Sequence, residues 1–277
     1  MAVVSYIRQL LGSALSSRRR ILKRSYLMPS EHLGRDVMID VYRPTVPPWR
    51  LLNLVIFNDG QDLERMNFET QLRDESKTLG LPNAIVVGVH AGDDRMNEYG
   101  TAGKLDYEGR GNKATEYQDF LIKELVPWLE DRYNIYHNPG KRAIAGFSLG
   151  GLSAFDVAWR NPSEFGAAGV FSGSLWWRGK KMNPAKPDAD LIVHNYVRKA
   201  KKAPPVRFWF MAGTEDETSD RNNNGIIDAI DDTLQLMQAL TEKGMMEDTD
   251  FTYVEVEGGK HEPETWGTVI IDFLKWL

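Results

Sequence analysis

Cysteine is absent from this chain of 277 residues. Without a thiol, the protein can form no disulfide, no thiolate metal site and no cysteine nucleophile. The absence does not by itself decide between a reducing and an oxidising compartment. Any nucleophile or metal ligand must therefore be a hydroxyl, carboxyl, amide, carbonyl or imidazole group.

Long apolar runs and an excess of positive charge are also missing. No run of the sequence approaches the roughly 18 apolar residues that a membrane-spanning helix requires. The net charge is −5, which argues against nucleic acid as a partner because proteins that bind it carry a basic face. The length and a hydrophobic content of 42% predict a single α/β domain over residues 1–277 with a large core.

The first 24 residues resemble a targeting segment only superficially. Arg8 and Gln9 interrupt the apolar stretch, and the three arginines at 18–20 follow it instead of preceding it. Apolar residues recur on one helical face, which predicts a helical extension over residues 1–24, either packed on the body or lying on a membrane surface. The lack of a secretory signal favours a cytoplasmic location, although the loop at 220–231 described below would also suit an exported protein.

Short apolar runs alternate with helical patterns along the chain, which is typical of a parallel sheet with crossover helices. Strands are expected at 38–44 (antiparallel and near one edge), 52–60, 84–92, 142–147, 166–174, 206–214 and 251–259. Helices are expected at 115–133, 152–160, 229–243 and 264–277, and Pro127 should bend the first of them.

Residues 146–150 read Gly-Phe-Ser-Leu-Gly and connect an expected strand to an expected helix. Glycines two positions to either side of Ser148 permit a sharp turn that lifts one side chain clear of the backbone. The G-x-S-x-G pattern alone is weak, but the strand before it and the helix after it are the context that a nucleophile requires. We therefore predict that Ser148 is a nucleophile, the alternative being an ordinary glycine-rich turn.

A serine hydroxyl is a weak nucleophile and needs a base that a third group orients. In α/β-hydrolases these groups follow in the order Ser, then Asp or Glu, then His. His261 lies downstream of the serine and directly beyond the last expected strand, and Asp216 follows the strand at 206–214. Glu215 and Glu217 flank Asp216 and remain alternatives for the acid.

The oxyanion of an acyl-transfer intermediate needs two N–H donors. One is expected to be the amide of Leu149, which follows the nucleophile at a helix start. The other is expected to be the amide of Gln61, because the tight Asp59-Gly60 turn after an early strand can aim it inward. The alternative for this second position is a plain strand-terminating turn.

A long polar loop at residues 176–190 follows the strand at 166–174 and leads into a further helix. Loops of this kind beyond strand ends are where α/β proteins usually build substrate sites. Trp176 and Trp177 open the loop, so one or both are candidates for lining a substrate pocket. A packing role is equally compatible with their positions.

Several stretches taken together resemble the esterase D type of esterases, a group that includes enterochelin-esterase-like enzymes, feruloyl esterases and mycolyltransferases. The stretches are IFNDGQDL, VVGVHAGDDRMNEYG, ELVPWLEDRYNIY, AGFSLGGLSAFDVAWRNPSEFGAAGVFSGSLWW, AGTED and GGKHEPETW, and they cover nearly the whole chain. The resemblance implies an α/β-hydrolase fold with Ser148, Asp216 and His261 as a triad. It also implies that the backbone amides of Gln61 and Leu149 bind the oxyanion. Arg95 and Glu98-Tyr99 share in the resemblance, and we interpret them as a structural ion-pair corner.

One segment departs from the commonest form of that family. Residues 220–231 read DRNNNGIIDAID, which matches the spacing of a calcium-binding loop with glycine at the sharp turn. The predicted ligands for a structural Ca²⁺ are Asp220, Asn222, Asn224, the carbonyl of Ile226, Asp228 and Asp231. The alternative is a polar loop in which Asp228 caps the following helix. Aspartate instead of glutamate at the last position shortens the reach toward the metal and alters its preference.

The leading hypothesis is a serine carboxylic-ester hydrolase that acts on a small-molecule ester through an acyl-enzyme and uses no organic cofactor. An acyltransferase with the same triad is a close alternative, because the fold and the triad serve both reactions. A second alternative, from a different functional class, is a non-catalytic, calcium-stabilised binding protein with a hydrolase fold. The sequence identifies neither the acyl and alcohol groups nor the oligomeric state.

Overall fold

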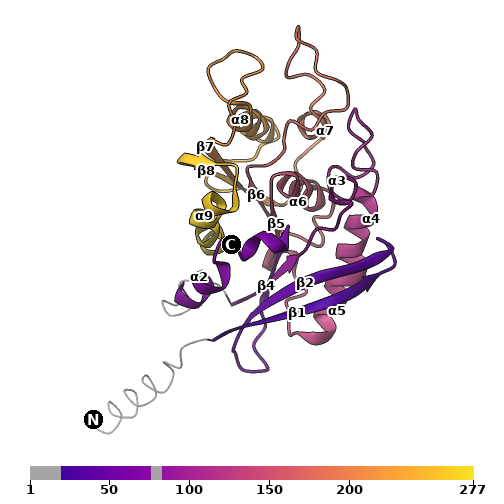
Figure 1. Ribbon diagram of the computed structural model, residues 1–277, viewed down its shortest axis with the longest axis vertical. Helices are drawn as coiled ribbons and strands as arrows, with labels where there is room; N and C mark the ends of the chain where they lie inside the picture. Colours follow the sequence, from indigo (N-terminus) through magenta and orange to yellow (C-terminus); the bar gives the residue numbers. More distant parts are fainter. Residues whose placement is uncertain (1–19, 76–82) are drawn as a thin grey trace, which may run out of the picture.

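An eight-stranded sheet in the order β1-β2-β4-β3-β5-β6-β7-β8 forms the centre of the computed structural model, which describes residues 20–75 and 83–277 (Figure 1). The strands are β1 (Ile21–Ser30), β2 (Arg35–Pro44), β3 (Asn53–Asn58), β4 (Ala84–Val89), β5 (Arg142–Phe147), β6 (Ala167–Phe171), β7 (Arg207–Glu215) and β8 (Phe251–Lys260). Strands β3 to β8 run parallel, whereas β1–β2 and β2–β4 pair antiparallel. The strands expected from the sequence are confirmed, and the chain has an α/β-hydrolase fold.

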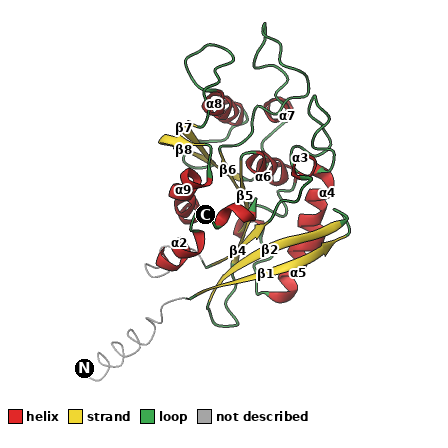
Figure 2. Cartoon of the chain, in the orientation of Figure 1, coloured by secondary structure: helices red, strands yellow, loops and turns green. Residues whose placement is uncertain are grey.

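Helices connect the parallel strands and cover both faces of the sheet (Figure 2). They are α2 (Phe68–Glu75), α3 (Arg95–Glu98), α4 (Ala114–Asp119), α5 (Val126–Arg132), α6 (Leu149–Arg160), α7 (Ile192–Lys199), α8 (Asp228–Thr241) and α9 (Pro263–Trp276). Shorter segments are the 3-10 turns η1 (Gly60–Leu63) and η3 (Pro139–Lys141) and the π-helical turn η2 (Phe120–Leu125). No helix in the described ranges is long and apolar enough to cross a membrane.

The N-terminal prediction is corrected in part. Residues 21–24 begin strand β1, where Ile21 pairs with Pro44 and Arg24 pairs with Val41, so no helix forms there. The ladder of backbone hydrogen bonds at the sheet edge outweighs the local helical pattern, because tertiary context overrides intrinsic propensity. The remainder of the predicted extension, residues 1–19, lies outside the described residues.

The helix expected at 115–133 is present as three consecutive segments, α4, η2 and α5. The Val126 amide donates to the carbonyl of Leu121, five residues back, as in a π-helix. Pro127 lacks the N–H that would bond the carbonyl four residues earlier, so the regular ladder is interrupted beside it. The irregularity expected from the proline is therefore a π-helical turn.

Alternate residues of the central strands belong to two different cores. In β3, Leu54 and Ile56 pack in the core that includes side chains of α4, η2 and α5 to α8. Val55 and Phe57 pack in the core that includes side chains of α2 and α9. This period of two follows from the pleat of the strand and explains why the buried strands read as continuous apolar runs.

Parallel strands bring their carboxyl ends to one edge of the sheet, where α/β proteins form their ligand sites. The segments after β3, β5, β7 and β8 therefore meet at this edge, which we call the carboxyl edge. Gln61, Ser148, Asp216 and His261 follow these four strands and so belong to this edge.

His194 of α7 is a fully buried ionisable side chain between α7 and α8. Its Nε2 bonds the carbonyl of Asp232 at 2.7 Å. Burial lowers the pKa of His194 to about 4. A pKa below that of the unfolded chain means that the unfolded state takes up the proton first, so stability is lost as the pH falls from about 6.5 toward 4.

Because of His194, we expect the free energy of unfolding to fall by about 2 kcal/mol when the pH is lowered from 7.5 to 5. Urea denaturation at the two pH values, with His194→Gln beside the wild type, measures this contribution. The His194→Gln protein should show a smaller difference between the two pH values. His137→Gln, at a histidine side chain that is 76% exposed, should keep the full difference. Equal pH dependence in His194→Gln and the wild type would contradict the assignment.

Candidate active site

The serine turn between β5 and α6 has a strained backbone. Ser148 has φ 55° and ψ −121°, a backbone conformation that residues other than glycine rarely adopt. A Cβ on Gly146 would lie 2.3 Å from the carbonyl oxygen of Gly150, so no larger residue fits there. The Ser148 amide donates to the carbonyl of Phe171 at 2.9 Å. These contacts hold the half-buried serine at the end of β5 in the geometry of a nucleophile elbow.

The hydroxyl of Ser148 lies 3.4 Å from that of Ser174, a residue that the sequence analysis did not single out. Ser174 is buried, and its amide also donates to the Ser148 carbonyl at 3.0 Å. The available signal was weak: a Gly-Ser pair just beyond a strand end. The backbone amide of Ser174 thus holds the Ser148 turn from the segment that follows β6.

Asp216 is buried in the turn after β7. One carboxylate oxygen accepts from the Gly213 amide at 3.0 Å, and the other is buried without a hydrogen-bond partner among the described residues. A Cβ on Gly213 would lie 2.3 Å from the Gly259 carbonyl, so β7 and β8 approach closely just before Asp216 and His261. This second oxygen can therefore accept a hydrogen bond from a further donor.

The two alternative acids are placed differently from Asp216. Glu215 is exposed to solvent. Burial raises the pKa of Glu217, and the charge of Asp228 raises it further, so Glu217 faces the 220–231 loop. The geometry therefore favours Asp216 among the three adjacent carboxylates.

His261 follows β8 directly and meets the edge of a tryptophan. Its ring centroid lies 5.3 Å from that of Trp266, with the planes at 83°. Trp266 stacks on Phe147 at 5.1 Å, and its Nε1 donates to the Ser172 hydroxyl at 2.9 Å. Because Phe147 directly precedes Ser148, this chain of aromatic contacts connects the His261 turn to the Ser148 turn.

The charges around His261 act on it in opposite directions. Partial desolvation lowers the pKa of His261, the Asp216 carboxylate raises it, and the Arg95 guanidinium lowers it. The balance keeps the imidazole neutral near pH 7, which is the form that accepts a proton. The charge of Asp216 thus acts on His261, whereas the hydroxyl of Ser148 is hydrogen-bonded to that of Ser174.

The turn after β3 carries the predicted oxyanion donor Gln61. Asp59 adopts a left-handed conformation with φ 59° and ψ 44°. The Gln61 side chain is held within this turn, where Nε2 donates to Asp59 at 3.3 Å and Oε1 accepts from the Ala91 amide at 3.0 Å. Leu149 is the first residue of α6, so no helical carbonyl four residues earlier is available to accept a hydrogen bond from its amide. The two residues border the elbow from β3 and from α6.

The ion-pair corner expected at Arg95 and Glu98 consists of two separate pairs. Arg95 forms two hydrogen bonds with Asp59, at 2.7 and 2.8 Å. Glu98 instead pairs with Arg35 through two bonds of 2.6 Å. Arg95 is thereby fixed beside the Gln61 turn, close enough for its charge to reach His261.

The two candidate pocket tryptophans differ in exposure. Trp177 is fully buried against Gly100 and Gly111, so its ring has no surface with which to contact a substrate. Trp176 is 38% exposed, and the guanidinium of Arg110 lies 5.5 Å from its ring centroid. We retain Trp176 alone as a candidate, and assign Trp177 the packing role that its position also allowed.

The 220–231 loop has the sharp turn that its sequence predicted. Gly225 has φ 86°. The Asp220 carboxylate accepts from the amides of Asn224 at 3.0 Å and Gly225 at 2.8 Å, and the Asn224 side chain accepts from the Ile226 amide at 2.8 Å. These bonds fold the first half of the loop around Asp220.

An arginine occupies the acidic side of the same loop. The Arg221 guanidinium bonds Asp188 at 2.9 Å, lies 3.4 Å from Asp228, and forms a two-pronged pair with Asp232. The Arg221 side chain is only 7% exposed. The buried guanidinium of Arg221 thus supplies positive charge to the three surrounding carboxylates from within the chain itself.

The last predicted metal ligand is also engaged internally. Asp231 accepts from Asn222 at 2.9 Å and from Gln235 at 2.8 Å. In the parts of the chain that the structure describes, no three or more Asp, Glu or His side chains are grouped so as to hold a metal ion. In this conformation Asp228 and Asp231 are turned to partners within the protein, so the loop does not form a finished metal site.

Comparison with known proteins gives a consistent result. A family model described as "Putative esterase" matches residues 30–277. The chain is 26% identical over 227 residues to the protein YbbA of Bacillus subtilis, described as uncharacterized, covering 80% of this chain and 84% of that protein.

Two solved structures share the fold at low sequence identity. The enterobactin esterase FES of Shigella flexneri has a TM-score of 0.73 at 18% identity, over 92% of this chain and 58% of that one. A structure described as ferulic acid esterase has a TM-score of 0.68 at 18% identity, over 94% of this chain and 97% of that one. This chain thus spans little more than half of the Shigella enzyme.

The electrostatic link between Asp216 and His261 is directly testable. Because the carboxylate charge raises the pKa of the imidazole, Asp216→Asn should lower the pKa of His261 measured by NMR titration. The same change should reduce ester turnover on the order of 10⁴-fold if Asp216 orients the imidazole. Glu215→Gln, one residue away and exposed, is the matched control and should change neither quantity. A shift in Glu215→Gln with none in Asp216→Asn would move the acid by one residue.

Proposed function

The chain belongs to this esterase family and is an esterase, and we propose that it hydrolyses carboxylic esters through an acyl-enzyme formed on Ser148. The observation that carries this proposal is the strained backbone of Ser148, with φ 55°, at the carboxyl end of a central parallel strand. Strain of this kind persists where the surroundings over-determine it, and here it lifts the hydroxyl out of the turn.

The proposed reaction gives a role to each member of the predicted triad and to both oxyanion donors. His261 takes the proton from Ser148 Oγ as that oxygen attacks the ester carbonyl carbon, and Asp216 stabilises the imidazolium. The amides of Gln61 and Leu149 bind the oxyanion of the tetrahedral intermediate. The imidazolium then protonates the departing alcohol, and water attacks the acyl-enzyme by the same steps to release the acid and free Ser148.

Ser148→Ala should lower ester turnover by several orders of magnitude, about 10⁴-fold or more, while the melting temperature stays close to that of the wild type. The substitution removes a hydroxyl whose hydrogen bond to Ser174 is long, at 3.4 Å. Ser174→Ala is the control, since it removes the partner and leaves the nucleophile, so most of its turnover should remain. Turnover by Ser148→Ala close to the wild-type rate would reject the elbow assignment.

For the substrate, we propose an ester with a bulky apolar or aromatic group. The segment from Ser174 to Trp176 leads from the nucleophile to an exposed indole, and the 105–107 loop docks beside it through the Tyr107 amide and the Arg178 carbonyl at 3.0 Å. Leu105 and Tyr107 are exposed as well. Enterobactin and ferulic acid, named for the two structural neighbours, are consistent with an aromatic ester.

Acyl transfer to an alcohol is the second candidate, because the same triad and oxyanion donors serve it. Product analysis separates the two reactions. Hydrolysis gives the free acid in the presence and absence of an added alcohol, whereas transfer gives a new ester in proportion to the alcohol.

We also propose calcium as a structural ligand of the 220–231 loop. The spacing of its oxygen donors and the turn at Gly225 support this. The Arg221 cluster is the competing source of positive charge, and calcium binding would require Asp228 and Asp231 to turn from their present partners. Because three residues separate Asp216 from Asp220, a cation in the loop would stabilise the segment that carries the catalytic acid.

If calcium binds, chelation should lower both the melting temperature and ester turnover, and added calcium should restore both. Calcium at 100 times its dissociation constant should add about 2.7 kcal/mol to stability. Asp220→Ala should behave like the chelated protein and not respond to calcium. Unchanged melting and turnover in chelator, with no metal in the purified protein, would instead leave Arg221 as the cation of the loop.

A further inference from the structure

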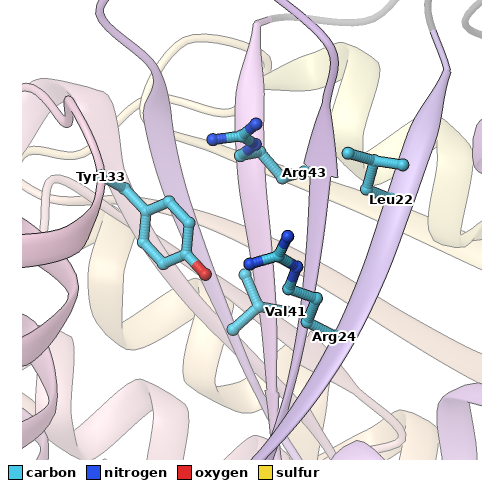
Figure 3. Close-up of a pocket in the computed structure, with 5 residues that line it drawn as sticks. All are labelled: Leu22, Arg24, Val41, Arg43 and Tyr133. Atoms are coloured by element: carbon cyan, nitrogen blue, oxygen red, sulfur yellow. The ribbon is translucent and has the colours of Figure 1, made fainter.

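A pocket of about 140 Å³ lies on the antiparallel pair β1–β2 at one border of the sheet, away from the carboxyl edge (Figure 3). Leu22 and Arg24 of β1, Val41 and Arg43 of β2, and Tyr133 after α5 line it. Its volume is close to the roughly 150 Å³ of a cavity that holds benzene, so it suits a small ligand.

Strand register arranges the two arginines diagonally on one face. Leu22 is opposite Arg43 and Arg24 is opposite Val41, so positive and aliphatic side chains alternate. Diagonal neighbours on one face of an antiparallel pair lie within reach of long side chains. Figure 3 shows both guanidinium groups extending from adjacent strands toward the side of the pocket occupied by Tyr133.

No ion pair joins either arginine to a carboxylate among residues 20–75 and 83–277, and Arg24 lies within hydrogen-bonding reach of the Tyr26 hydroxyl. Arg43 lies 6.0 Å from the centroid of the Tyr133 ring, a cation–π contact that leaves its N–H donors to other partners. The Tyr133 hydroxyl bonds that of Tyr26 at 3.0 Å. Two neighbouring like charges without a counter-charge repel, and a bound anion would remove that repulsion.

The pocket is separate from the proposed active site. Val41 pairs with Val87 and Tyr42 with Val86, so Arg43 lies toward the amino end of β4. Ser148, Asp216 and His261 follow the carboxyl ends of the parallel strands, at the opposite edge. Binding here and ester hydrolysis can therefore be measured independently.

We propose that this pocket binds a small oxyanion that carries an apolar group, with the carboxylate or phosphate held between Arg24 and Arg43. Guanidinium groups bind carboxylate and phosphate in the same forked geometry, so the arginines recognise either headgroup. Leu22, Val41 and the Tyr133 ring provide apolar surface for the attached hydrocarbon.

Calorimetric titration with hexanoate, acetate, hexyl phosphate and inorganic phosphate, each at matched ionic strength in chloride, tests the proposal. Hexanoate should bind about tenfold or more tightly than acetate, and hexyl phosphate likewise relative to phosphate, because the longer chains bury apolar surface. The tighter of hexanoate and hexyl phosphate identifies the headgroup that the pocket prefers.

Arg24→Met and Arg43→Met should each weaken this binding by about tenfold or more, since each removes one charged fork. Arg50→Met, at an exposed arginine in the loop after β2, is the matched control and should bind like the wild type. Binding that survives both pocket substitutions, or the absence of binding by either hexyl compound, would overturn the proposal. Equal affinities for short and long anions would overturn its apolar part.

Discussion

The bond between the Asn58 side chain and the Gly150 carbonyl, at 2.8 Å, joins the two turns on which the site depends. Asn58 ends β3, just before the Gln61 turn, and Gly150 lies in the first turn of α6 after Ser148. Tyr117 donates to the other end of the Asn58 amide at 2.7 Å, so the side chain cannot rotate without losing both bonds. A buried amide that is bonded at both ends restrains the distance between the Ser148 turn and the Gln61 turn.

The Asp216 turn is held by a different kind of contact. At Gly213, β7 approaches β8 so closely that a Cβ would lie 2.3 Å from the Gly259 carbonyl oxygen, so no side chain fits there. Next to this close contact, the Thr214 hydroxyl accepts a hydrogen bond from the Gly258 amide at 2.8 Å. Backbone packing therefore positions the chain just before Asp216, and the ion pairs of Arg221 hold the chain just after it. The Asp216 carboxylate lies between these two anchored segments, which limits how far it can move relative to His261.

The sequence was most informative where local pattern and tertiary role coincide. The strands, the Gly-Phe-Ser-Leu-Gly turn and the positions of Ser148, Asp216 and His261 after strand ends could be predicted from it, because apolar runs and glycines mark strand ends. Strand β1 could not, since an edge strand with mixed polarity carries little periodic signal and gains its hydrogen bonds only from β2. Ser174 and the Arg221 cluster were missed for a related reason, because their partners are distant in sequence.

The two ends of the sheet differ in chemical character. Strand β1 presents Arg24 at one border and ends near Pro29, which lacks an N–H, whereas β8 presents Glu255 and Glu257 at the other. Free strand borders are templates for association with another chain, and charge or proline on them discourages it. Two copies that approached through equivalent borders would bring like charges together. The charges on the two borders thus disfavour the pairing of equivalent edges, independent of whatever chemistry occurs between those borders.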